Sequence, residues 1–170
     1  MVGGQNEVCL GAVSHHNLTD NKWTHTIAKL NTPRRSAGGC FIKGIVYIVG
    51  GHSDSKPLNC IERINAVRIV ENQPKWQHIK LAEDVFVPTA YPSVAPLNDS
   101  ELVILGGLAH SNIITYNFKT GELEKVAEQE NYASMQNLCN QTARVERNHV
   151  VALVQIANET KLIKWTKGST

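Results

Sequence analysis

Three short apolar runs of this sequence each end in a pair of glycines. The runs are MVGG (1–4), GIVYIVGG (44–51) and ELVILGG (101–107), and the intervals from Gly3 to Gly50 and from Gly50 to Gly106 are 47 and 56 residues. Runs rich in Val, Ile and Tyr and bounded by Gly, Pro, Asn or Asp are typical of strands. Strand signals that recur about every fifty residues indicate a repeat protein built from small sheets.

Each of the last two runs is the second half of a hairpin. The segment AGGCFIKGIVYIVGG (37–51) parallels SVAPLNDSELVILGG (93–107), with Lys43-Gly44 and 97–100 in the turn between two apolar stretches. A degenerate copy, CNQTARVERNHVVALVQ (139–155), has both stretches but lacks the glycines. The sequence therefore predicts a pair of buried strands that ends in Gly3-Gly4, Gly50-Gly51 or Gly106-Gly107.

A second pattern follows each hairpin. A ring and an asparagine precede a Thr-containing turn, and a large apolar residue stands seven positions after the ring, as in His16 to Trp23 and Tyr116 to Leu123. The middle copy keeps Trp76 but has Ile69-Val70 where the ring and asparagine are expected. This pattern predicts an outer hairpin. We expect Trp23, Trp76 and Leu123 to hold equivalent positions in the cores of successive four-stranded antiparallel sheets.

Three features recur in order: an apolar strand that ends in Gly-Gly, an aromatic or histidine ring followed by Asn, and a Trp. This order resembles the kelch repeat, whose copies fold as blades of a β-propeller. The resemblance implies an all-β fold, a partial propeller of about three to four blades, with blade pieces at 1–30, 31–81, 82–126 and 127–170. At about fifty residues a blade, 170 residues do not close a ring alone. We expect further blades of a longer chain, or another chain, to complete it. Residues 126–135, where the last two pieces meet, could instead form a helical turn.

Composition narrows the class of partner. The chain has 170 residues, 17 Lys+Arg and 15 Asp+Glu, and this near balance of charge argues against nucleic acid as a partner. Its longest apolar runs are five residues, too short to cross a membrane, and its first twenty residues carry no secretory signal.

The four cysteines (9, 40, 60 and 139) form no CxxC motif, so we expect reduced thiols. The resemblance implies a cytoplasmic protein, with association with the cytoskeleton as an option.

Motifs for catalysis, metals and cofactors are missing from the sequence. The seven histidines show no HxxxH or HxH spacing, and neither a GxSxG motif nor a phosphate-binding glycine loop occurs. We expect no enzyme activity, no metal and no cofactor. One alternative is a propeller enzyme of the oxidase or isomerase type. That enzyme needs a His, Tyr and Glu cluster on the innermost strands, whereas 37–42, 91–96 and 138–143 supply mainly small and apolar residues. A second alternative is a substrate receptor of a ubiquitin ligase, which needs an adaptor-binding domain.

Surface recognition through loops remains as the predicted function. In the resembled fold, loops between the second and third strands of a blade and loops between blades emerge on one face. Here these loops are 31–35, 52–59, 83–89, 108–111 and 127–137. We expect them to bind a peptide or protein partner. The candidate residues are Arg34, Arg35, His52, Asp54, His110 and Tyr132.

Overall fold

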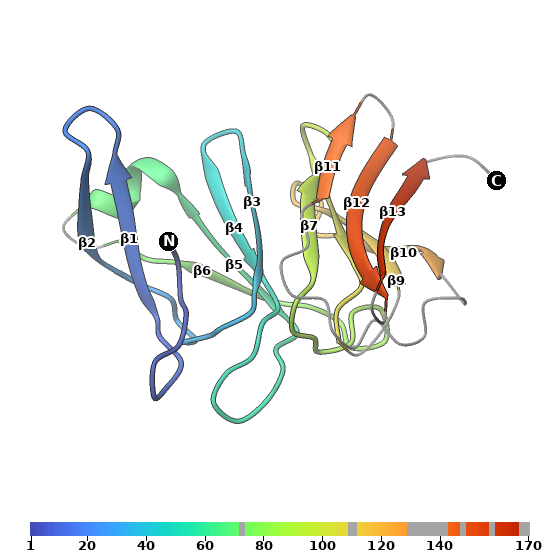
Figure 1. Ribbon diagram of the computed structural model, residues 1–170, viewed down its shortest axis with the longest axis horizontal. Helices are drawn as coiled ribbons and strands as arrows, with labels where there is room; N and C mark the ends of the chain where they lie inside the picture. Colours follow the sequence, from blue (N-terminus) through green and yellow to red (C-terminus); the bar gives the residue numbers. More distant parts are fainter. Residues whose placement is uncertain (72–73, 109–111, 129–142, 147–148, 157–158, 167–170) are drawn as a thin grey trace.

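The structure is a computed structural model, which describes residues 1–71, 74–108, 112–128, 143–146, 149–156 and 159–166. Within these residues the chain forms thirteen strands and one short 3-10 helix. Every pair of neighbouring strands is antiparallel, and each sheet is built from strands that are consecutive in the sequence. Four such sheets stand one after another like the blades of a fan (Figure 1). The chain is thus an all-β segment of a β-propeller.

The first two sheets come from the N-terminal half. The first consists of β1 (Ala12–Asn17) and β2 (Lys22–Lys29), and Val2 forms a bridge to Val13 at its side. The second sheet contains four strands in sequence order: β3 (Gly38–Ile42), β4 (Ile45–Val49), β5 (Cys60–Asn65) and β6 (Gln77–Lys80).

The third sheet repeats the order of the second, and the fourth shows three strands. The strands of the third are β7 (Ser93–Pro96), β8 (Glu101–Leu105), β9 (Asn112–Asn117) and β10 (Leu123–Glu128); those of the fourth are β11 (Ala143–Glu146), β12 (His149–Ile156) and β13 (Glu159–Thr166). Strand β7 contacts both β3 and β11, which makes these three the innermost strands of their sheets (Figure 1). The helical alternative is wrong for 126–128, which belong to β10. The rest of 126–135 lies outside the described residues.

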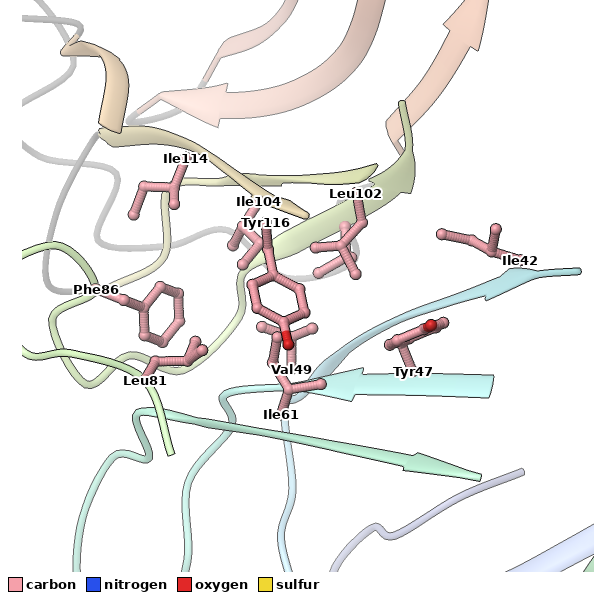
Figure 2. Close-up of a cluster of buried hydrophobic side chains, with 11 residues drawn as sticks. Ile42, Tyr47, Val49, Ile61, Leu81, Phe86, Leu102, Ile104, Ile114 and Tyr116 are labelled. Carbon is pink, nitrogen blue, oxygen red and sulfur yellow. The ribbon is translucent and has the colours of Figure 1, made fainter. Parts of the chain in front are cut away.

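Apolar side chains fill the spaces between successive sheets, because alternate residues of a strand point to opposite faces. Tyr47 and Val49 of β4 face the third sheet, whereas Ile48 between them faces the first. Figure 2 shows the larger cluster, in which side chains of the second sheet meet Leu102, Ile104 and others of the third. Its buried members are Ile42, Tyr47, Val49, Ile61, Leu81, Phe86, Val94, Leu102, Ile104, Ile114 and Tyr116.

The outer turn of the second sheet differs from the expected pattern. Residues 66–70 form the 3-10 helix η1 (Ala66–Val70), and the side chain of Asn65 caps it by accepting a hydrogen bond from the Val67 amide at 3.1 Å. The placement of Ile69-Val70 in the ring position is therefore wrong. Gln77 pairs with Arg63, so the register places Ile64 beside Trp76, and both lie in the same buried cluster. The helix lengthens the turn, and the seven-residue spacing is lost.

Strand register makes Trp23, Trp76 and Leu123 comparable, but they differ in burial. Trp23 pairs with His16 and Leu123 with Tyr116, while Trp76 lies beside Ile64. Trp76 is only 4% exposed and packs toward the first sheet, and Leu123 packs on the cluster between the second and third sheets.

Trp23 is the exception, at 62% exposed, so the expectation that it is a buried core residue is wrong. Val13 points into the space between the first and second sheets. His16 lies three residues along the same strand, so it and its partner Trp23 face the other way. Among the described residues, no element covers that outer face.

Candidate loop face

Three loops come together at one edge of the sheets, the lower edge in Figure 1. They are the β2–β3 loop (30–37), the β4–β5 loop (50–59) and the β6–β7 loop (81–92). Arg35 and His52 exchange two backbone hydrogen bonds of 3.0 and 2.9 Å, and the Thr89 amide donates to the Leu58 carbonyl at 3.2 Å. We call this surface, with the preceding loop 3–11, the loop face. The expectation that loops 31–35 and 52–59 share one face is confirmed.

The glycine pair Gly50-Gly51 joins the second sheet to the third at this face. Both residues have positive φ angles, 58° and 95°, which a residue with a side chain rarely adopts. The Gly51 amide donates to the carbonyl of Thr89 at 2.9 Å, and a Cβ placed on Gly50 would lie 2.7 Å from the same oxygen. The pair therefore allows β4 to turn closely against the loop that leads into the next sheet.

The other two glycine pairs adopt the same geometry. The φ angles are 67° and 121° at Gly3 and Gly4, and 55° and 129° at Gly106 and Gly107. The Gly4 amide donates to the carbonyl of Arg34 at 2.9 Å, as Gly51 does to Thr89 one sheet later. The three pairs are thus equivalent structural positions. The carbonyls of Arg34 and Thr89, in successive loops, are the matching acceptors for the first and second pairs.

Arg34 is not an exposed recognition residue, and the expectation that it contacts a partner is wrong. Its side chain is 1% exposed and forms an ion pair with Glu62 of β5, which is fully buried. The guanidinium also donates to the Gly50 carbonyl at 2.8 Å and to the Thr32 carbonyl at 3.1 Å. A buried carboxylate on β5 requires a compensating cation, and Arg34 supplies it.

The Glu62 carboxylate is saturated by the β2–β3 loop. It accepts hydrogen bonds from the amides of Asn31 at 2.7 Å and Thr32 at 2.9 Å, besides its bond with Arg34. The buried pair therefore fixes the backbone of this loop, which carries Arg35 onto the loop face. Sequence reasoning missed Glu62 because the residue lies inside a strand pattern, 28 positions after its partner.

Arg35, His52 and Asp54 do come together, around a residue that the sequence did not single out. Asp54 accepts a hydrogen bond from the Cys9 amide at 2.7 Å, and the Cys9 thiol donates to the His52 carbonyl at 3.3 Å. The hydrogen bonds from Cys9, and after them the charge of Arg35 and the neighbouring His52, hold the pKa of Asp54 below its usual range. Cys9 belongs to loop 3–11, which begins with Gly3-Gly4 as loop 50–59 begins with Gly50-Gly51. This alignment of the repeats was the signal that could have identified it.

Of the remaining candidates, His110 and Tyr132 lie outside the described residues. In the described part of the chain, no group of three His, Cys, Asp or Glu side chains is placed to hold a metal ion. No helix there is long and apolar enough to span a bilayer. Cys9, Cys40 and Cys60 are free thiols, and burial raises the pKa of Cys40 to about 12.

Comparison with known families finds a match to most of the second sheet. The family model of the kelch motif matches residues 33–68, which run from the β2–β3 loop through β3, β4 and β5 into η1. This segment is therefore similar to a kelch repeat. The match contains Gly50-Gly51 and both members of the buried pair, Arg34 and Glu62, and it confirms the kelch family expected from the sequence. A search of curated proteins finds no match to the chain.

Proposed function

We propose that this kelch segment is a noncatalytic interaction module that binds a peptide or protein partner through the loop face. Kelch repeats commonly serve in protein interactions. The observation that carries the proposal is the cross-linking of loops from successive sheets by backbone hydrogen bonds, including those between Arg35 and His52 and between Thr89 and Leu58. A surface ordered before binding loses little conformational entropy when a partner arrives.

The exposed chemistry of the loop face suits a mixed polar and apolar contact. Asp54 and Lys56 are exposed, Arg35 and His52 are half-buried, and Val8 is 55% exposed. The Arg35 guanidinium makes no hydrogen bond to any described residue, so its donors are available to a partner. Arginine beside an apolar contact is a common anchor at protein interfaces.

Two features support a noncatalytic role. Burial is the main cause that raises the pKa of the Cys9 thiol, so the thiol stays protonated at neutral pH and is a poor nucleophile. Asp54, the acidic group beside it, is ionised and already accepts the Cys9 amide. Free Cys9, Cys40 and Cys60 support the proposal of a cytoplasmic location.

We further propose that another blade, of a longer chain or of another chain, covers the outer face of the first sheet. The equivalents of Trp23, namely Trp76 and Leu123, each pack against the preceding sheet. Ile27, also on β2, is 63% exposed. Under this proposal the boundaries at 30 and 81 separate successive blades. The boundary expected at 126 falls inside β10 (Leu123–Glu128), so the third blade extends at least to 128.

The loop face is tested by capture from a native lysate with quantitative mass spectrometry, using matched charge variants. Arg35→Glu/Lys56→Glu changes the loop face, and Lys22→Glu/Lys119→Glu makes the same change of charge at turns on the other edge. We expect a set of proteins that the first variant loses and the second retains. If both variants retain the same set, the loop face is not the binding surface.

A further inference from the structure

A groove of about 380 Å³ lies at the other end of the second sheet, away from the loop face. It is bounded by Ile45 at the start of β4, the end of β5 and the segment that leads from η1 toward β6. Its size falls within the range of pockets that hold small ligands or the side chains of a peptide. We call it the basic groove, because three of its lining residues are the cations Arg63, Arg68 and Lys75.

Among the described residues, the lining of the basic groove contains no acidic side chain. The Arg63 guanidinium is oriented by the Gln77 side-chain oxygen at 2.9 Å and contacts the Phe118 carbonyl at 3.5 Å, which leaves further N–H donors. Arg68 and Lys75 are exposed and form no ion pair or hydrogen bond with any described side chain. Three cations around one groove repel each other unless an anion joins them.

Two cations elsewhere on or beside the second sheet have acidic partners. Lys43, in the β3–β4 turn, forms an ion pair with Asp99 at 2.6 Å, and Arg34 pairs with Glu62. What distinguishes the basic groove is that three cations line one hollow without an ion pair among the described residues.

We propose that the basic groove binds an acidic peptide segment, with one or more Asp or Glu side chains between Arg63, Arg68 and Lys75. A guanidinium presents paired donors that match the two oxygens of a carboxylate. The Asn65 and Gln77 amides can bond to the peptide backbone, and Ile45 offers an apolar contact at one side. A lone inorganic anion would leave most of the groove empty. This site is separate from the loop face and does not depend on its proposed function.

The test uses fluorescein-labelled hexaglutamate and fluorescence anisotropy, with hexaglutamine as the uncharged control. Arg68→Gln/Lys75→Gln removes two charges from the groove, and neither side chain holds the fold together. Lys29→Gln/Lys80→Gln removes two exposed charges at the ends of β2 and β6, away from the groove. We expect the groove variant to bind hexaglutamate about tenfold or more weakly than the unmodified chain, and the control variant to bind within about twofold of it.

Several results would overturn the proposal. They are an absence of hexaglutamate binding by the unmodified chain, an equal loss in both variants, and equal binding of hexaglutamine. Displacement of the bound peptide by millimolar inorganic phosphate would assign the groove to a small anion instead. Circular dichroism and melting temperature verify that each variant remains folded.

Discussion

Arg34 and Glu62 form an ion pair at which both side chains are withdrawn from solvent, with 1% and 0% of their surfaces exposed. Removing two charges from water is costly, and their attraction offsets this only when hydrogen bonds satisfy the remaining atoms. Here two amides and two carbonyls of the surrounding backbone complete the set. The pair is therefore sensitive to the loss of either partner.

Arg34→Met is expected to lower the free energy of unfolding by about 3–5 kcal/mol, because it leaves the Glu62 carboxylate buried without a cation. Urea unfolding followed by tryptophan fluorescence measures the change. Arg35→Met, at the neighbouring half-buried position, is the matched control and should cost less than about 1 kcal/mol. Similar losses at both positions would show that the buried pair contributes nothing specific.

The close approach at Gly50 predicts a difference between two glycines that both have positive φ angles. Gly50 (φ 58°) would place a Cβ 2.7 Å from the Thr89 carbonyl, whereas a Cβ on Gly44 (φ 82°) meets no atom within 4 Å. Gly50→Ala is therefore expected to destabilise the chain by about 1–3 kcal/mol more than Gly44→Ala, since both share the backbone strain. Thermal unfolding of the two variants would contradict this if their melting temperatures agreed.

The two tryptophans should respond differently to truncation. Trp76→Ala is expected to cost about 3–5 kcal/mol through the cavity that it leaves between the first and second sheets. Trp23→Ala should cost less than about 1 kcal/mol in this chain, because the side chain is 62% exposed. The comparison is made by urea unfolding and by thermal unfolding, each followed by circular dichroism. A melting temperature for Trp76→Ala within a degree of the unmodified chain would refute the assigned register.

Asp54 should contribute a pH-dependent part of the stability. The pKa of its carboxyl is lowered in the folded chain, first by the hydrogen bond from the Cys9 amide. Its contribution is therefore complete above the ordinary pKa near 4 and disappears as the pH falls through the lowered folded value. Melting temperatures of the unmodified chain and Asp54→Asn should differ at pH 6 and converge toward pH 3.

Asp84→Asn is the control for this pH series, because Asp84 accepts no hydrogen bond from a described residue. Its melting temperature is expected to follow that of the unmodified chain throughout. A difference between Asp54→Asn and the unmodified chain that stayed constant from pH 6 to pH 3 would contradict the role assigned to the Asp54 carboxylate.

Local signals in the sequence predicted the sheets well. The glycine pairs, the Lys43-Gly44 turn and the strand Ile45–Val49 follow from alternation and turn chemistry, which act over a few neighbouring residues. The pairing of Tyr116 with Leu123 follows from a turn of constant length. In the second sheet the same rule failed, since η1 lengthens the turn before Trp76 and only the folded register reveals Ile64 as its neighbour.

The loop face was only partly predictable from the sequence. The alternation of hairpins brings Arg35 and His52 to the same edge, as the strand pattern implies. Which of the adjacent Arg34 and Arg35 points inward depends on Glu62, whose burial follows from packing among several strands rather than from its own neighbours. Cys9 was missed for a similar reason, because its contact with Asp54 joins loops of two different sheets.

The Arg34–Glu62 pair also limits how the repeats can be exchanged or recombined. The position that Arg34 occupies at the glycine pair is Thr89 in the following repeat, so the two copies are not interchangeable parts. A consensus design that averaged the repeats, or a recombination crossover between residues 34 and 62, would separate Arg34 from Glu62. One of the two charges would then be left unpaired in the interior. The smallest block that can be transplanted intact therefore spans both residues, and the kelch match at 33–68 contains it.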